Sequence, residues 1–209
     1  MHISDGILNS TVSLSSLAVS SGIFLWSLKG IRNQDLSKTA LMTAALFVGS
    51  LIHIPVGPSS VHLLLTGLAG ILLGRGAYAA LAIAVALQAM LFQFGGVTAI
   101  GANTIMMGIP ALIAAWLFRG ILKRFGKKVA VPAGAVGGAV SVLLASLFLA
   151  LFLWITGEQF REVAVLAVTA QIPVMVIEAI ITGFMAGFIV KVKPELLWTS
   201  NLTPDDNKS

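Results

Sequence analysis

Three long stretches of this chain carry no charged side chain. Residues 39–74, 76–118 and 129–157 contain no Lys, Arg, Asp or Glu. A helix needs about 20 apolar residues to cross the hydrocarbon core of a bilayer, so each stretch has room for one or two transmembrane helices. The composition agrees, because 57% of the side chains are hydrophobic and only 10% are charged. The expected fold class is therefore an all-α membrane protein.

Seven transmembrane helices account for these apolar stretches and the breaks between them. The turn Pro55-Val56-Gly57-Pro58 separates the second helix from the third, because proline ends a helix. An uncharged glycine-rich segment at 94–103 separates the fourth from the fifth. We expect one domain, a bundle over residues 1–193, followed by a polar cytoplasmic tail over 194–209. The predicted helices are 11–28, 39–54, 61–74, 77–93, 104–118, 130–156 and 163–190.

The positions of the basic residues predict the orientation of the bundle. Cytoplasmic loops of membrane proteins are rich in Lys and Arg. If the amino terminus is outside, only Arg161 of the 13 basic residues lies on the outer face. We therefore predict a multi-pass protein of the cell membrane with its amino terminus outside and its carboxyl terminus in the cytoplasm. The net charge of +5 then reflects topology and contact with the lipid bilayer, and no nucleic-acid partner is expected.

The amino terminus offers three nitrogen ligands from two residues. The α-amine of Met1, the backbone amide nitrogen of His2 and its imidazole can close two fused chelate rings around one ion. The α-amine has an ordinary pKa of about 8 and imidazole one of about 6.5, so both can lose their protons near neutral pH. The amide gives up its proton only to an ion that forms strong in-plane bonds, such as Ni(II) or Cu(II). The alternative is that His2 belongs to an ordinary polar leader.

Two further histidines lie on the same predicted outer face. His53 is expected to end the second helix and His62 to open the third, on either side of the proline turn. An imidazole near a membrane segment is a functional-site candidate, and histidine is the commonest metal ligand. The alternative is a pair of interfacial histidines that water satisfies. His62 is the stronger candidate ligand, and His53 can be a ligand or a partner of one.

Three motifs in this order resemble one transporter family. They are Met1-His2-Ile3-Ser4-Asp5-Gly6-Ile7-Leu8, the segment from Pro55 to Leu63, and the segment from Phe94 to Gly108. The chain is similar to the substrate-specific membrane (S) subunits of energy-coupling factor (ECF) nickel/cobalt transporters, the CbiM/NikM family. The resemblance implies a seven-helix bundle into which the amino-terminal segment folds. It also implies that Met1, His2 and His62 bind a divalent metal.

The same resemblance implies cargo and partners. The bound substrate is Ni(2+) or Co(2+). The expected partners are an ECF transmembrane coupling subunit and two ATPase subunits, together with a small accessory membrane subunit. The chain has no phosphate-binding loop of its own, so the energy for uptake must come from other subunits.

Four polar residues inside the apolar regions are secondary candidates. Thr98, Asn103 and Thr104 belong to or follow the glycine-rich segment and can hydrogen-bond a metal-bearing imidazole, as groups around a metal site commonly do. Glu178 is an acidic residue within the last predicted helix, where it needs a partner or a proton. It can pair with Arg75 or orient a neighbouring subunit, and we expect its role to be structural.

The sequence therefore predicts a non-enzymatic subunit that captures Ni(II) or Co(II) at the outer face for ATP-driven uptake. The alternative is a stand-alone channel or secondary transporter for a divalent metal or a small solute. Such a protein needs ionisable residues or inverted repeats along its path, and within the spans only Glu178 qualifies. A membrane-embedded metalloenzyme is disfavoured because no general base is expected near the histidines.

Overall fold

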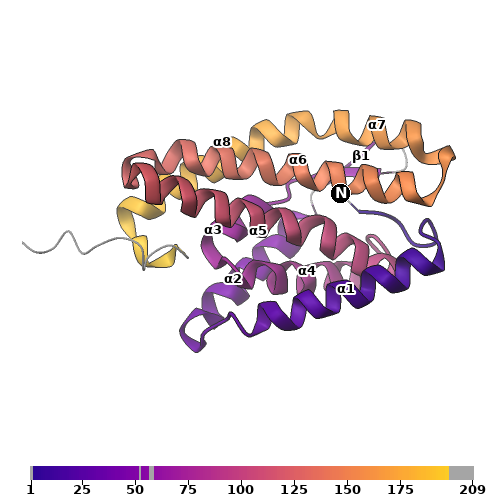
Figure 1. The fold of residues 1–209 in the computed structure, drawn as a ribbon, viewed down its shortest axis with the longest axis horizontal. Helices are drawn as coiled ribbons and strands as arrows, with labels where there is room; N and C mark the ends of the chain where they lie inside the picture. The colour runs from indigo at the N-terminus through magenta and orange to yellow at the C-terminus, as the bar shows by residue number, and fades with distance from the viewer. Residues whose placement is uncertain (1, 52, 57–58, 198–209) are drawn as a thin grey trace, which may run out of the picture.

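The computed structural model describes residues 2–51, 53–56 and 59–197. These residues form eight α-helices, one two-stranded hairpin and five short 3-10 turns (Figure 1). In chain order they are α1 (Ser10–Leu28), η1 (Asn33–Asp35), α2 (Leu36–Gly49), β1 (His53–Val56), β2 (Ser59–His62), α3 (Thr66–Leu73), α4 (Gly76–Phe92), η2 (Val97–Ala99), α5 (Ile100–Phe125), η3 (Lys127–Val129), α6 (Ala130–Thr156), η4 (Glu158–Phe160), α7 (Arg161–Ala170), α8 (Ile172–Val192) and η5 (Pro194–Leu196).

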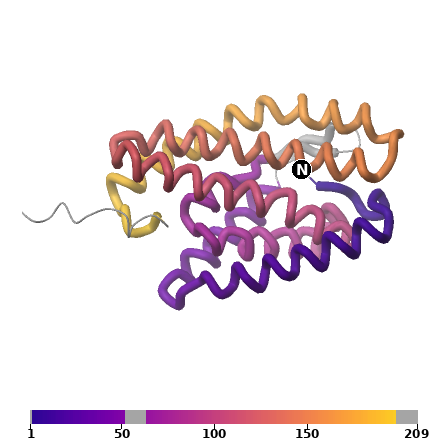
Figure 2. The backbone as a smooth tube through the Cα atoms, in the orientation of Figure 1, coloured from indigo at the N-terminus to yellow at the C-terminus, as the bar shows by residue number. Residues whose placement is uncertain are grey.

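The long helices run side by side around α5. Helix α5 packs against α1, α3, α4 and α6, and α6 packs in turn against α8. Figure 2 shows α1 on one side of this bundle and the pair α6 and α8 on the other. The segment that precedes α1 does not extend away from the bundle but turns back into it (Figure 1). The first described residues, His2 and Ile3, are therefore buried among the helices.

Four helical stretches of the described residues are long and apolar enough to cross a membrane. They are Ser10–Leu28, Val97–Phe125, Lys127–Thr156 and Glu158–Val192, and α4 is a shorter apolar helix. The helical membrane fold is thereby confirmed. The count of seven crossings and the orientation of the termini stay predictions.

Helix α1 has the side-chain distribution of a helix that faces lipid. Its buried residues are the small polar Ser16, Ser20 and Ser27, whereas Leu14 and Leu25 are more than half exposed. In water this arrangement would be unfavourable, because apolar side chains normally face the interior. In a bilayer it is favourable, since small residues let helices approach closely and apolar ones contact the lipid tails.

The predicted ends of the second and third helices are wrong. Helix α2 ends at Gly49 and α3 begins only at Thr66. Between them β1 and β2 pair antiparallel, with His53 opposite His62 across the two strands. Proline cannot donate to a helical hydrogen bond and restricts the residue before it to extended backbone. Pro55, which lies within β1, therefore favours the extended backbone of Ile54 over a continuation of the helix.

Two other boundaries also differ from the prediction. Helix α5 begins at Ile100, so Gly101 and Asn103 are helical and the irregular stretch is shorter than 94–103. The predicted helix 163–190 is two helices, α7 and α8, that meet at Gln171. Pro173 lies in the first turn of α8, where a missing backbone N–H costs nothing but prevents α7 from continuing.

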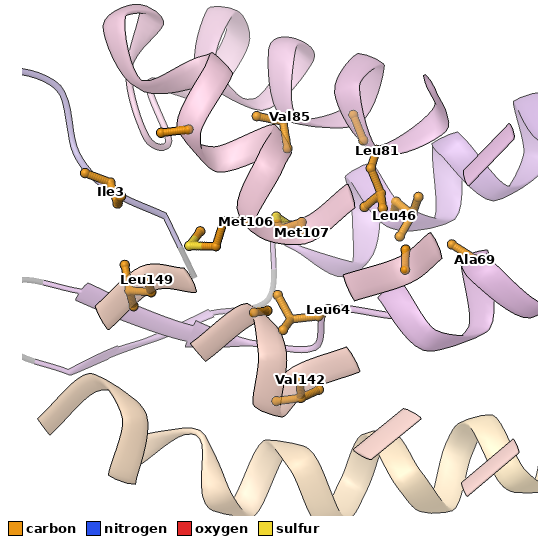
Figure 3. Close-up of a cluster of buried hydrophobic side chains, with 14 of the residues drawn as sticks. Ile3, Leu46, Leu64, Ala69, Leu81, Val85, Met106, Met107, Val142 and Leu149 are labelled. Carbon is orange, nitrogen blue, oxygen red and sulfur yellow. The ribbon is translucent and has the colours of Figure 1, made fainter. Parts of the chain in front are cut away.

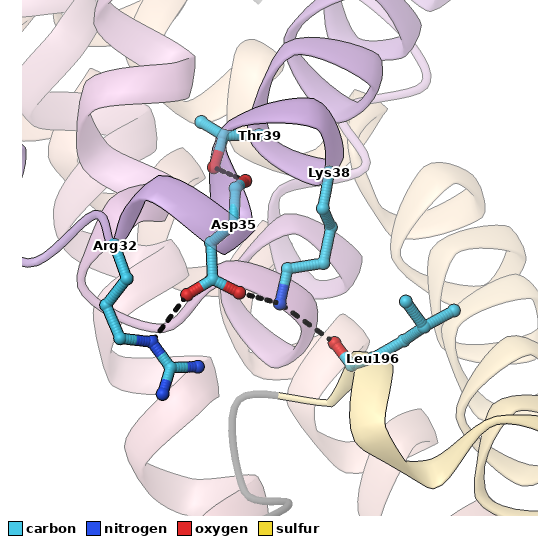
Figure 4. Close-up of polar contacts among 5 residues, drawn as sticks. All are labelled: Arg32, Asp35, Lys38, Thr39 and Leu196. Carbon is cyan, nitrogen blue, oxygen red and sulfur yellow. Dashed lines mark hydrogen bonds and ion pairs between the residues drawn. The ribbon is translucent and has the colours of Figure 1, made fainter.

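One end of the bundle is tied together by Asp35. Its carboxylate accepts from Arg32 at 2.8 Å and pairs with Lys38 at 3.1 Å, and the Lys38 ammonium also donates to the carbonyl oxygen of Leu196 (Figure 4). The hydrogen bond from Arg32, followed by that from Lys38, holds the pKa of the Asp35 carboxyl below its usual range. The predicted tail over 194–209 thus begins with a docked turn, η5. Residues 198–209 lie outside the described part of the chain, and the domain boundary stays a prediction.

Arg75 does not pair with Glu178. Its guanidinium stacks 4.1 Å from the ring centre of Trp26 and donates to the carbonyl oxygen of the same residue at 2.9 Å. Arg75 thereby caps the carboxyl end of α1, where a positive charge is favourable. The expected pairing was wrong because the helix end offers closer acceptors.

Glycines allow the helices to touch backbone to backbone. A Cβ atom built on Gly70 of α3 would lie 2.1 Å from the carbonyl oxygen of Ala111 in α5. We expect Gly70→Ala to lower the free energy of unfolding by about 2 kcal/mol, because α3 and α5 must separate. Thermal unfolding in detergent micelles measures this. Gly120→Ala is the matched control, since its Cβ would meet nothing within 4 Å. Equal melting temperatures for the two variants would contradict the argument.

Candidate metal centre

The first residues of the described chain are buried. Ile3 is 1% exposed and His2 is 8% exposed. The Ile3 side chain belongs to the main hydrophobic cluster of the bundle, together with Leu64, Met106 of α5 and Leu149 of α6 (Figure 3). Burial of an apolar side chain so close to a chain terminus fixes the course of the backbone, because the ends of a chain are otherwise poorly ordered.

Asn103 holds the backbone of Ile3 from both sides. The amide N–H of Ile3 donates to Asn103 Oδ1 at 2.8 Å, and Asn103 Nδ2 donates to the carbonyl oxygen of Ile3 at 3.1 Å. Asn103 is itself 1% exposed on the first turn of α5. Its side chain therefore mimics the edge of a β-strand and satisfies both backbone groups of the residue that follows His2. A buried pair of this kind fixes both the position and the direction of the segment.

A second tie lies two residues farther along the chain, at Asp5. The Asp5 carboxylate accepts from the Thr98 amide N–H at 3.1 Å and from the Thr98 hydroxyl, while the Thr98 carbonyl oxygen accepts from the Ser13 hydroxyl at the start of α1. The hydrogen bonds from Thr98 hold the pKa of the Asp5 carboxyl below its usual range. Asp5 is therefore ionised at neutral pH and joins the amino-terminal segment to the turn before α5.

Two glycines make room for these ties. Gly95 and Gly96 have φ angles of +81° and +74°, a region that glycine adopts without strain. A Cβ atom on Gly95 would lie 2.5 Å from Asn103 Nδ2, and one on Gly96 would lie 2.2 Å from Asp5 Cβ. The glycine-rich segment is thus the surface on which the amino-terminal segment rests.

The predicted ligands fall partly outside the described residues. Met1 lies outside them, and so do the side chains of His53 and His62, although the backbone of β1 and β2 places these two residues opposite one another. Two residues after His62 the chain reaches Leu64, which packs in the same cluster as Ile3. The residue that follows the hairpin so closely and the amino-terminal segment are therefore both anchored in the main hydrophobic cluster. The metal-ligand set itself stays a prediction.

The described side chains form no cluster of typical metal ligands. No three His, Cys, Asp or Glu side chains gather within the ranges that the structure covers. Thr98 and Asn103, which the sequence singled out, contact Asp5 and the Ile3 backbone. Thr104 is buried on α5, and its hydroxyl has no hydrogen-bond partner among the described residues. The role of Asn103 could not be predicted from the spacing of residues in the sequence, because its partner is the backbone of Ile3, 100 residues away.

Comparison with known proteins identifies the family. Residues 2–196 match the family model of the cobalt uptake substrate-specific transmembrane region, CbiM. The chain belongs to the CbiM family. The resemblance drawn from its three motifs is thereby confirmed. As a CbiM-family chain it is a multi-pass membrane protein, and its family is one of metal transport, not of enzymes.

Similar proteins extend over nearly the whole of this CbiM-family chain. A Haemophilus influenzae protein whose name assigns it to metal transport is 35% identical over 94% of this chain and 97% of its own length. An Archaeoglobus fulgidus protein whose name assigns it, as a fused NikMN chain, to nickel transport is 27% identical over 94% of this chain and 68% of its own. A crystal structure of a transition metal transporter has the same fold, with a TM-score of 0.75 at 24% identity over 92% of this chain and 93% of that one.

Proposed function

We propose that this CbiM-family protein is the substrate-binding subunit of an ECF-type transporter and captures Ni(II) or Co(II) at the outer face of the membrane. The observation that carries the proposal is the buried amino-terminal segment, in which Asn103 binds both backbone groups of Ile3. A segment held in this way presents the preceding residue, His2, to the interior. An ordinary polar leader would have no reason to be buried.

The proposed ligands are the Met1 amine, the His2 amide nitrogen and imidazole, and the His62 imidazole. Four nitrogen donors suit the planar coordination that Ni(II) favours. Ile3 follows the chelate directly, so its fixed backbone sets the plane of the His2 amide. His53, opposite His62 in the hairpin, is the residue best placed along the backbone to orient His62 or to add a further nitrogen.

Uptake against a gradient needs partners. The proposal assigns the ATP-driven step to two ATPase subunits and a transmembrane coupling subunit, and a small accessory membrane subunit completes the assembly. Glu178 is the one buried acid among the described residues. This scarcity of acidic groups favours a capture subunit over a stand-alone channel or secondary transporter, whose path is marked by ionisable residues.

Reconstitution of the purified protein alone into liposomes tests the proposal. We expect saturable binding of about one Ni(II) or Co(II) ion per chain and no sustained flux, because the proposal assigns movement of the ion across the membrane to the partner subunits, and the chain has no phosphate-binding loop of its own. Continuous passive or gradient-driven entry of metal into the liposomes would instead support the channel or secondary transporter. Vesicles of the same lipid without protein provide the baseline.

A further inference from the structure

An apolar groove of about 290 Å³ lies where α5 meets α6. Its lining side chains are all apolar and belong to Ile121, Phe125, Val129, Pro132, Ala133 and Val136. The first two lie on α5, the third ends η3, and the last three lie on α6. The groove therefore has one wall on each side of the turn that joins the two helices.

The groove begins at a membrane boundary and continues along a membrane span. The candidate spans Val97–Phe125 and Lys127–Thr156 meet at this turn. From Val129 to Val136 the groove follows two turns of helix, a rise of about 10 Å. Phe125 and Val136 are 61% and 44% exposed, so the groove is open at the surface of the bundle. It therefore lies at the depth at which lipid tails begin.

The turn itself, residues 123–128, carries four exposed cations, and we call it the basic turn. The four are Lys123, Arg124, Lys127 and Lys128. The chain reverses direction at Gly126, whose φ is +74° (Figure 1), so one pair of cations stands on each side of the reversal. The Arg124 guanidinium lies 5.6 Å from the ring centre of Phe125, which lines the groove. Positive charge therefore lies directly beside an apolar wall.

The charge of the basic turn calls for an anion from outside the chain. The sequence has no Asp or Glu between residues 36 and 157, and none of the ion pairs found among the described residues includes a cation of the basic turn. A topology signal needs only basic residues at the end of a span, not a groove beside them. Arg and Lys bind phosphate oxygens, and basic pockets between transmembrane helices bind anionic lipid headgroups. Cations next to an apolar groove therefore fit an amphiphile that carries a phosphate.

We propose that the basic turn and the adjoining groove bind one anionic phospholipid. The cations of the turn hold its phosphate, and one acyl chain lies in the groove along α6. The predicted orientation of the bundle places this turn at the cytoplasmic leaflet, which is the leaflet that carries anionic lipid. The site contains none of the proposed metal ligands, so it stands independently of metal capture.

Native mass spectrometry of the full-length protein in detergent tests the inference by titration with three probes. Dioleoyl phosphatidylglycerol carries a net negative charge, dioleoyl phosphatidylcholine has the same tails without it, and glycerol 1-phosphate has a phosphate without tails. We expect one phosphatidylglycerol to bind about a hundredfold more tightly than phosphatidylcholine, because each nearby Lys or Arg contributes roughly a fivefold factor. Glycerol phosphate should not be retained. Equal affinity for the two lipids, or retention of glycerol phosphate as tightly as the anionic lipid, would overturn the inference.

A double variant tests the headgroup contact. Lys127→Gln with Lys128→Gln should weaken binding of phosphatidylglycerol about thirtyfold, since two cations are lost, and should leave phosphatidylcholine nearly unaffected. Lys29→Gln with Lys193→Gln is the matched control, because it removes the same charge from two exposed lysines at the ends of α1 and α8. The control should bind like the wild type. If both double variants behaved alike, the basic turn would serve another partner, such as an acidic protein surface, and the lipid site would be refuted.

A third variant tests the groove separately. Val136→Trp fills it and should weaken both lipids about tenfold while the preference for phosphatidylglycerol persists, because the acyl chain loses its contacts with the wall. Leu151→Trp is the control, at a residue that is 52% exposed near the other end of α6 and outside the groove. If Val136→Trp does not fold, Phe125→Ala, which removes part of the opposite wall, should weaken both lipids in the same direction. Wild-type affinity of a folded groove variant for both lipids would overturn the inference.

Discussion

One glycine placed ahead of Met1 is expected to lower the affinity for Ni(II) by more than about a hundredfold, since even groups outside the ligand shell account for factors of 10 to 100. The extension keeps every side chain of the protein and converts the Met1 amine into a peptide amide. Two fused chelate rings cannot form without that amine. The buried Ile3 and its bonds to Asn103 also leave little room for the backbone to slide by one residue.

Calorimetry and the visible absorption bands of bound Ni(II) measure this effect. Mass spectrometry first establishes that the added glycine is the true amino terminus after processing. A glycine added after Ser209 is the control, because it changes the length of the chain equally and leaves the amino terminus free. Unchanged affinity and an unchanged spectrum in the extended protein would remove the amine from the ligand set.

Asn103→Leu is expected to weaken metal binding about thirtyfold, equivalent to about 2 kcal/mol. The substitution keeps the size of the side chain but leaves the N–H and carbonyl groups of Ile3 without partners in a buried position. Each such group costs roughly 1–3 kcal/mol if it stays buried, so the amino-terminal segment should leave its place. Asn103→Asp, which still accepts from the Ile3 N–H, should have a smaller effect.

Thr43→Val is the control for Asn103→Leu. It also removes a buried polar group, but the Thr43 hydroxyl donates only within α2, to the carbonyl oxygen of Thr39. Limited proteolysis without metal provides a second reading, because a released segment becomes accessible to aminopeptidases. If Asn103→Leu bound Ni(II) like Thr43→Val and resisted proteolysis equally, the hold on Ile3 would have no part in capture.

The sequence predicted the helices best where nothing interrupts an apolar run. The expected helix 130–156 coincides with α6, Ala130–Thr156, because 27 residues without charge or an internal break leave the backbone no alternative in a membrane. The hairpin was missed because Ile54, Val56 and Val61 suit a strand as well as a helix that borders on lipid. Apolar runs this short do not distinguish the two.

The sequence predicts the nitrogen donors of the candidate site, but it does not predict the hydrogen bonds that hold the amino-terminal segment in place. The nitrogen donors of Met1 and His2 follow from covalent structure alone, and they need no knowledge of the fold. The bonds between Asn103 and Ile3 join a side chain to a backbone across 100 residues, and every residue type offers the same backbone groups.

The hydrogen bonds between Ile3 and Asn103 have a consequence for the biogenesis of the protein. The residues that leave the ribosome first must wait for α5, which is made some 100 residues later, before they can settle. During insertion the amino-terminal segment therefore lacks its hydrogen-bond partner on α5, and its backbone is not yet fixed in place. Under the proposed function, the ability to bind metal therefore arises only after α5 has been made and inserted.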